Sequence, residues 1–403
     1  MQTDIQRPEQ KQLLDIVAAN MRGQKYTLPI TNYQQLLKEC SAQAVLLQVF
    51  DTIPQSNLPE DPKRVNYLLG RYAGNLNIHN QHAQLHRLLE KHGIDYCVLK
   101  GSASAYYYPN PTLRAMGDVD FLVAPDAIAK TTQILKGEGF TPWEEEHICH
   151  VVLYKPGAHL EMHFEPAGMP DGKAGQMMRQ YLANIFEAAE TVEIDGMAFR
   201  KPSDFHHGLI LLMHTYHHML SEGVGVRHLT DWSAFISALD EDVFANLFEE
   251  KLKAIGLWQF AKIISGTAHV YLGAPYRKWM GEIDRELCGD LMEDILSGGN
   301  FGKKDGSRVY QGLAISDRGK DGLQKNAFVQ VFASLNALAR NRYHIMEKLP
   351  FLLPIGWLLI CFRRIGKIWR KELSMPKLAG FGEKVDSRKK LYHQFKLFET
   401  EEP

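Results

Sequence analysis

Apolar positions follow two different periods along the chain. From Gln10 to about His92 they recur every three or four residues, in stretches such as KQLLDIVAAN and VNYLLGRYAGNLNIHNQHAQLHRLLEKHG, which predicts helices. Gly93 is the expected end of the last of these helices. Beyond Ser203 the helical spacing returns, and a glycine-rich charged stretch, SGGNFGKKDGSR, precedes the last predicted helices.

Between these helical regions the apolar runs are shorter. IDYCVLKG and GDVDFLV predict two strands separated by the helical turn SASAYYYP, and DAIAKTTQILKGEGF predicts a helix. HICHVVLYKP and AHLEMHFEP predict a hairpin in the same sheet, turning at Pro156 and Gly157. A helix around AGQMMRQYLANIFEAAE and a second hairpin, turning at Asp195 and Gly196, complete this part.

The pattern therefore predicts an α+β fold with a small mixed β-sheet flanked by helical regions. A chain of 403 residues is longer than one typical compact core. We expect a helical N-terminal region over 1–92, a mixed core over 93–202, a helical domain that completes the substrate pocket over 203–345, and a basic amphipathic tail over 346–403.

Composition limits the partners and the compartment. The net charge of −1 gives no global attraction to nucleic acid, so a long nucleic acid is not the expected partner. The five cysteines are scattered without a C-x-x-C spacing, which argues against a disulfide framework or a zinc site and favours the cytoplasm. The first residues, MQTDIQRPEQ, do not resemble an export signal.

The chemistry of interest begins at LRAMGDVDFLVAP. Residues two apart on a strand face the same side, so Asp118 and Asp120 place two carboxylates together in an apolar stretch. Such a pair repels unless a cation lies between its members, and hard oxygen ligands favour Mg²⁺ or Mn²⁺. Glu161 and His163 share a face of a later strand, where Glu161 can add a third carboxylate if the strands are neighbours.

A second element of this pattern lies upstream. In LKGSASAYY, Gly101 and Ser102 stand between a strand and a helix start, where glycine lets the backbone approach a ligand and free amides face an anion.

Gly101 and Ser102, then Asp118 and Asp120, then Glu161 resemble the active-site signature of the DNA polymerase beta-type nucleotidyltransferase superfamily. LKGSASAYYYPNPTLRAMGDVDFLV is similar, more closely, to an uncharacterised bacterial nucleotidyltransferase family. The motif-level resemblance covers about 96–164, with weaker echoes in HTYHHML, VRHLTDW and SGGNFGKK.

The resemblance implies a nucleotidyltransferase core that transfers a nucleoside monophosphate from a nucleoside triphosphate, with ATP as the expected donor, to an acceptor hydroxyl. Asp118, Asp120 and Glu161 would hold Mg²⁺ or Mn²⁺, and Glu161 would also help to deprotonate the acceptor. Lys100, Gly101, Ser102 and Arg114 would contact the triphosphate.

Arg114 lies in a segment, 103–117, that is longer than the usual superfamily spacing. Two interpretations stay open for it: a forked donor to phosphate oxygens, or an ion pair that neutralises Asp118 or Asp120.

Several residues further along are candidates for a substrate pocket. His214 and His218 are four apart on one helical face, but HTYHHM lacks the glutamate of a zinc protease motif, which favours packed or substrate-facing histidines over catalytic zinc. Arg227 and Asp231 either shape the pocket or form an N-terminal capping network, and His163 either orients Glu161 or is a core histidine.

The C-terminal region is apolar and basic. The run 349–364 is broken by prolines and is shorter than the roughly 20 residues of a spanning helix. Residues 358–371 place Leu358, Phe362 and Trp369 beside basic residues, which suits either peripheral contact with an anionic membrane, at the inner face, or a helix packed on its own domain.

The main rival to an enzyme is a catalytically inactive nucleotidyltransferase-like protein that binds nucleotides or acts as a scaffold. Three costly acids clustered together argue against it. The acceptor class stays open among a small molecule, a glycan and a protein.

Overall fold

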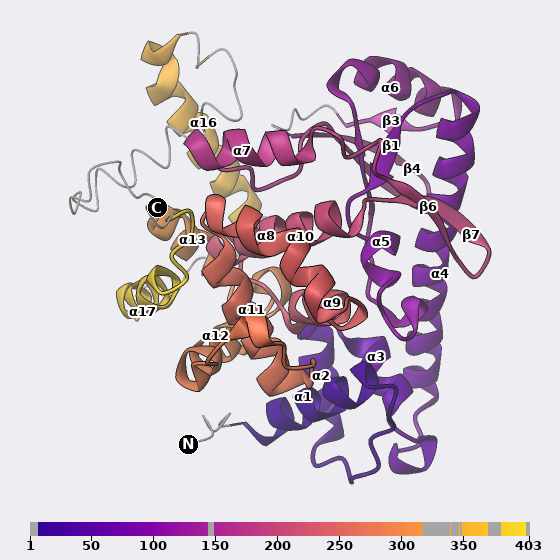
Figure 1. The fold of residues 1–403 in the computed structure, drawn as a ribbon, viewed down its shortest axis with the longest axis vertical. Helices are drawn as coiled ribbons and strands as arrows, with labels where there is room; N and C mark the ends of the chain where they lie inside the picture. Colours follow the sequence, from indigo (N-terminus) through magenta and orange to yellow (C-terminus); the bar gives the residue numbers. More distant parts are fainter. Residues whose placement is uncertain are drawn as a thin grey trace.

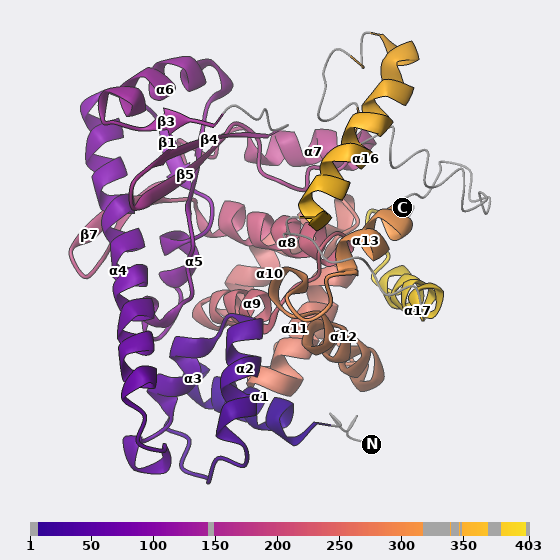
Figure 2. The same ribbon diagram turned by 180° about the vertical axis from the view of Figure 1, so that it is seen from behind.

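The computed structural model describes residues 7–143, 149–316, 349–369 and 380–399, together with Ala339 and Met346. Its N-terminal part is helical, as predicted, and ends in a helix that runs along one side of the molecule past both the other N-terminal helices and the sheet (Figures 1 and 2). Asp61 caps this long helix by accepting hydrogen bonds from the amides of Lys63 and Arg64. The helices are α1 (Pro8–Met21), α2 (Tyr33–Gln43), α3 (Leu46–Thr52) and α4 (Pro62–Lys91).

A five-stranded mixed sheet follows α4, in the order β1-β2-β5-β4-β3. Its members are β1 (Tyr96–Val98), β2 (Val119–Val123), β3 (Thr141–Pro142), β4 (His150–Lys155) and β5 (Ala158–His163). The β2–β5 pair is parallel, and the other three pairs are antiparallel. The predicted hairpin is confirmed, since β4 and β5 join around Pro156 and Gly157. The short strand β3 was outside the sequence prediction.

The second predicted hairpin is also confirmed. β6 (Glu190–Ile194) pairs with β7 (Met197–Lys201), and the φ angles of Asp195 and Gly196 are 51° and 75°. Two successive left-handed residues are what a tight two-residue hairpin turn requires.

The remaining elements are mostly helical. The short ones that bear on the site are α5 (Ser102–Ala105), η2 (Pro111–Leu113) and η5 (Asn300–Gly302). The longer ones are α6 (Ile128–Gly137), α7 (Gly172–Leu182), α8 (Asp204–Leu220), α9 (Val226–Ala238), α10 (Glu241–Ala254), α11 (Trp258–Leu272), α12 (Arg285–Gly298), α13 (Arg308–Ser316), α16 (Leu353–Trp369) and α17 (Phe381–His393). The predicted α+β class with a small mixed sheet is therefore confirmed.

Two apolar clusters hold these layers together. The larger cluster extends from Leu13 in α1 to Phe395 after α17, so N-terminal and C-terminal segments share one core. The smaller cluster joins the sheet to α4 through residues such as Leu89, Phe121 and Met162. The division into four regions stays a prediction.

Helix α16 has an exposed apolar surface. Phe351 just before it is 73% exposed, and Phe362 within it is 69% exposed. Among the helices that the structure describes, none is both long and apolar enough to cross a membrane.

Candidate functional site

The site is built on the parallel pair β2 and β5. Their register places Asp120 directly opposite Glu161, and Asp118 comes immediately before β2. The sequence predicted a third carboxylate at this site only if the two strands are neighbours. The structure shows that they are. Asp120 is 2% exposed, whereas Asp118 and Glu161 are half-buried.

Two cationic groups contact the most buried of these carboxylates. Lys100 Nζ lies 2.9 Å from Asp120 Oδ1, and His163 Nε2 lies 3.1 Å from the same oxygen. His163 Nε2 is also 3.6 Å from Glu161 Oε2. Lys100 belongs to the turn after β1, so the turn and the two strands meet at these acids.

The local electrostatics give the three acids different pKa values. Burial and the neighbouring Asp120 raise the pKa of Asp118 to about 6. Burial also acts to raise the pKa of Asp120, but Lys100 and His163 outweigh it and hold that pKa below the ordinary range. The hydrogen bond from His163, acting against burial, lowers the pKa of Glu161.

The pKa of His163 is raised, whereas that of its partner Asp120 is lowered. Burial acts to lower the pKa of His163, but its interactions with Asp120, Cys149 and Glu161 raise it to about 10. The imidazole is therefore a buried cation that helps to keep Asp120 ionised.

The donor set fits a hard divalent cation. Ligand atoms of Asp118, His159 and Glu161 lie within 4.8 Å of one another, and so do those of Asp120, Glu161 and His163. Glu161 belongs to both groups, so the carboxylates can bind one or two ions between them, with His163 acting as a hydrogen-bond donor to Asp120 and not as a ligand of these ions. Sequence reasoning missed His159, although its spacing of two from Glu161 places it on the same strand face.

The turn at Gly101 is held against α4. Gly101 has a φ of 57°, and a Cβ there would lie 2.6 Å from His82 Cε1, so only glycine fits. The hydroxyl of Ser102 contacts Nδ1 of both His79 and His82, which burial keeps neutral by lowering their pKa values to about 4 and about 3. The Ser102 side chain thus anchors the turn.

Neither histidine was identified from the sequence. His79 and His82 are three apart in a helix that has apolar residues in the same pattern, and only the packing of α4 on α5 reveals that both meet Ser102.

The long segment 103–117 connects the sheet to the helical body. Arg114 makes a two-pronged ion pair with Asp231 in α9, at 2.7 Å for Nε to Oδ1 and 2.8 Å for Nη2 to Oδ2. Tyr108 donates a hydrogen bond from its hydroxyl to Asp231 Oδ1. Asn75 in α4 donates to the carbonyls of Thr112 and Arg114. The principal ion-pair partner of Arg114 is therefore Asp231 and neither Asp118 nor Asp120.

Asp231 lies in the middle of α9, where it cannot cap the helix. The cap is Gly225, whose amide donates to Nδ1 of His228. The capping alternative for Asp231 was therefore wrong, because the helix begins earlier than the motif suggested.

The other pocket candidates lie on the helical side of the site. Arg227 packs over the ring of Phe301, 5.4 Å from its centroid, and donates weakly to the carbonyl of Ala115 at 3.4 Å. His214 is buried, with its ring 5.4 Å from that of His228.

Lys303, which directly follows η5, is a further basic residue on this side. Burial, Arg71 and Arg227 together lower its pKa. Lys303 belongs to the stretch SGGNFGKK and was missed as a site residue.

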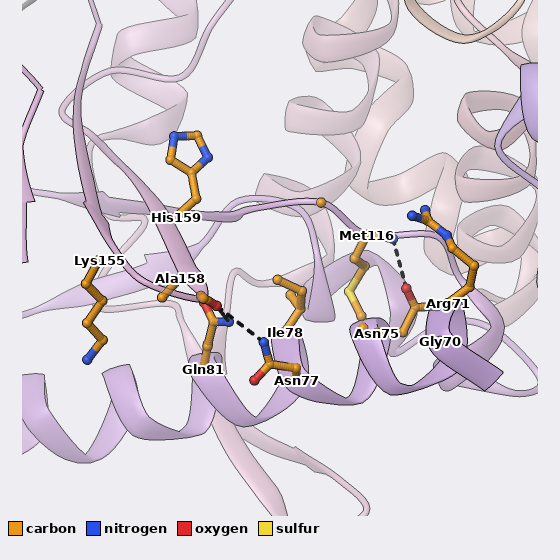
Figure 3. A pocket seen from close by; sticks show the side chains of 13 residues that line it. Gly70, Arg71, Asn75, Asn77, Ile78, Gln81, Met116, Lys155, Ala158 and His159 are labelled. Carbon is orange, nitrogen blue, oxygen red and sulfur yellow. Dashed lines mark hydrogen bonds between the residues drawn. The ribbon is translucent and has the colours of Figure 1, made fainter. Parts of the chain in front are cut away.

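A pocket of ≈ 500 Å³ adjoins the acids. Figure 3 shows its lining, with Asn77, Gln81 and Arg71 on α4 and His159 on β5. Asn77 and Gln81 both donate to the carbonyl of Gly157, which fixes the β4–β5 turn against the helix. No acidic residue of the described parts lines this pocket.

Outside one family, the chain shows little similarity to known proteins. No curated protein matches the chain. A solved structure, an antigenic nucleotidyltransferase-like protein from Paracoccidioides brasiliensis, is 19% identical and covers 50% of this chain and 94% of its own, with a TM-score of 0.34. A family model described as uncharacterised nucleotidyltransferase matches residues 30–273, more than half of the chain and all of the acids above. The chain therefore belongs to this nucleotidyltransferase family.

Proposed function

We propose that the protein is a Mg²⁺-dependent nucleotidyltransferase of the polymerase beta type, of bacterial kind, that transfers a nucleoside monophosphate from a triphosphate, with ATP as the first candidate, to an acceptor hydroxyl. The observation that carries the proposal is the pairing of Asp120 with Glu161 across β2 and β5, with Asp118 beside them and Lys100 on Asp120. The family supports nucleotidyl transfer as the general activity.

Each acid has a role in the proposed reaction. The acceptor oxygen forms a bond to the α-phosphorus, the bond to pyrophosphate breaks, and the acceptor proton passes to a base, for which Glu161 is the candidate. Asp118, Asp120 and Glu161 would hold Mg²⁺ or Mn²⁺, which neutralises charge that develops on the phosphate oxygens. Lys100 and the turn at Gly101 and Ser102 would position the triphosphate.

The basic residues on the helical side support the same assignment. Burial and the positive charges of Arg71 and Arg227 lower the pKa of Lys303, and a bound triphosphate would offset this electrostatic cost. Arg114, which already pairs with Asp231, would act mainly by fixing the segment 103–117.

The pocket of ≈ 500 Å³ is the proposed acceptor site. It reaches His159, whose nitrogen lies within 4.8 Å of the ligand atoms of Asp118 and Glu161, so an acceptor there would meet the reacting centre. Its amide and basic side chains suit the hydroxyl groups of a small molecule, a glycan or a protein side chain. The free state of the four described cysteines supports a reducing compartment such as the cytoplasm.

The test is pyrophosphate release with Mg²⁺, each triphosphate in turn, and fractionated cell extract as the source of acceptor hydroxyls. We expect release by the unaltered chain and none by the double variant Asp118→Asn, Asp120→Asn. Asp126→Asn changes an exposed acid just after β2 and is the matched control that should retain release. Equal turnover in the double variant would refute the proposal, and Mg²⁺-dependent binding of ATP without release would favour the inactive binding protein.

A further inference from the structure

A second group of metal-ligating side chains lies behind the acids. Cys149 comes immediately before β4, and its carbonyl accepts a hydrogen bond from the amide of Phe164 after β5. His150 on β4 pairs with His163 on β5, and their rings lie 4.8 Å apart. One ligand atom each from Cys149, His150 and His163 falls within 4.8 Å of the other two.

The spacing of these atoms suits a tetrahedral ion. Zinc binds thiolate sulfur at about 2.3 Å and imidazole nitrogen at about 2.0 Å, so two such ligands of one tetrahedral ion lie about 3.5 Å apart. Cys149 Sγ and His150 Nδ1 are 3.5 Å apart.

The orientation of His163 is a second, independent observation. Its Nε2 faces Asp120 Oδ1 at 3.1 Å, whereas its Nδ1 is buried and has no hydrogen-bond partner among the described residues. Histidines that ligate metals commonly bind through one nitrogen while the other donates to a carboxylate. His163 has this arrangement, and one of its ring nitrogens lies within 4.8 Å of the ligand atoms of Cys149 and His150.

We propose that Cys149, His150 and His163 bind one soft divalent metal ion of the zinc class, through Sγ, an imidazole nitrogen and Nδ1 respectively, with water as a fourth ligand. The ion would replace the thiol proton of Cys149 and the proton on Nδ1 of His163, and both protons would pass to solvent. The ligands are softer than the oxygens of Asp118 and Glu161, so the two sites would select different metals.

The position of the site supports exchange with solvent and coupling to the acids. Cys149 is the one half-buried member of the four cysteines described, while the others are buried. The bound ion would fix His163 in the form that donates from Nε2 to Asp120. Binding of this ion would not require nucleotidyl transfer.

The test uses Co²⁺ as a probe of the full-length protein, after reduction and removal of metals. We expect one equivalent of Co²⁺ to give a thiolate-to-cobalt charge-transfer band that excess Mg²⁺ leaves unchanged and Zn²⁺ removes. Cys149→Ser should abolish the band, and Cys288→Ser, the matched control at a buried cysteine, should keep it. Absence of the band, or its persistence in Cys149→Ser, would overturn the proposal.

A second variant guards against loss of folding. His150 is half-buried at the start of β4, so His150→Ala should keep the cooperative thermal transition and yet weaken Co²⁺ binding at least about tenfold. Unchanged Co²⁺ affinity in a folded His150→Ala protein would show that the cysteine and histidines form only an ordinary hydrogen-bonded group.

Discussion

Removing the charge of Asp231 should strongly destabilise the fold. Arg114 and Asp231 have side chains only 3% and 6% exposed, and two hydrogen bonds of 2.7 and 2.8 Å join them. Asp231→Asn leaves the buried guanidinium without its counter-charge, and breaking such a pair costs about 3–5 kcal/mol. We expect the free energy of unfolding to fall by that amount in urea titrations at neutral pH.

An exposed ion pair provides the control. Lys25 and Asp51 have side chains 60% and 45% exposed, so Asp51→Asn should cost less than about 1 kcal/mol. The double variant Arg114→Met, Asp231→Leu removes both charges and should lose less stability than the sum of its single variants. A cost for Asp231→Asn as small as that for Asp51→Asn would refute the structural role given to Arg114.

Three further outcomes follow from the site and from α16. Gly101→Ala should lower the melting temperature and the triphosphate affinity, because the new methyl group meets His82 and the backbone has a left-handed φ. Thermal unfolding and ATP titration measure the two effects, and unchanged values of both would contradict the role given to this turn. Because the folded pKa of Asp118, about 6, exceeds its ordinary value of 3.8, ionising it costs stability as the pH rises through 6, and a metal ion offsets that cost. Mg²⁺ should therefore raise the melting temperature more above pH of about 6 than below it, and a pH-independent rise would count against Asp118 as a ligand. Liposomes rich in anionic lipid should co-sediment the full chain, and replacing the exposed Phe351 and Phe362 with serine should weaken this while leaving the core residues of α17 in place. Equal binding by that variant would exclude this apolar surface as the contact.

Most of the sheet could be predicted because its signals are local. The alternation in GDVDFLV and AHLEMHF fixes which residues face together, and the Pro-Gly and Asp-Gly turns fix the two hairpins. The helix predicted from AGQMMRQYLANIFEAAE ends earlier, at Leu182, because local apolar spacing does not specify where the chain turns.

The candidate site could be predicted where local spacing carries the signal. Asp118 and Asp120 follow from the spacing of one strand, Gly101 and Ser102 follow from the turn before a helix, and the spacing that places Glu161 beside His163 would also have identified His159. The contacts of Ser102 with α4 and of Arg114 with Asp231 depend on the packing of elements distant in sequence, with 117 positions separating the ion pair. Such pairs leave no periodic signal, so sequence reasoning could not choose the partner of Arg114.

Transfer of label from a triphosphate tests the central claim most directly. The full-length protein, Mg²⁺ and fractionated cell extract are incubated with ATP labelled at either the α- or the γ-phosphate. Nucleotidyl transfer predicts that α-label enters an acceptor, that γ-label leaves as pyrophosphate, and that the Asp118→Asn, Asp120→Asn variant does neither. Transfer of γ-label to the acceptor, or equal α-labelling by that variant, would contradict the account.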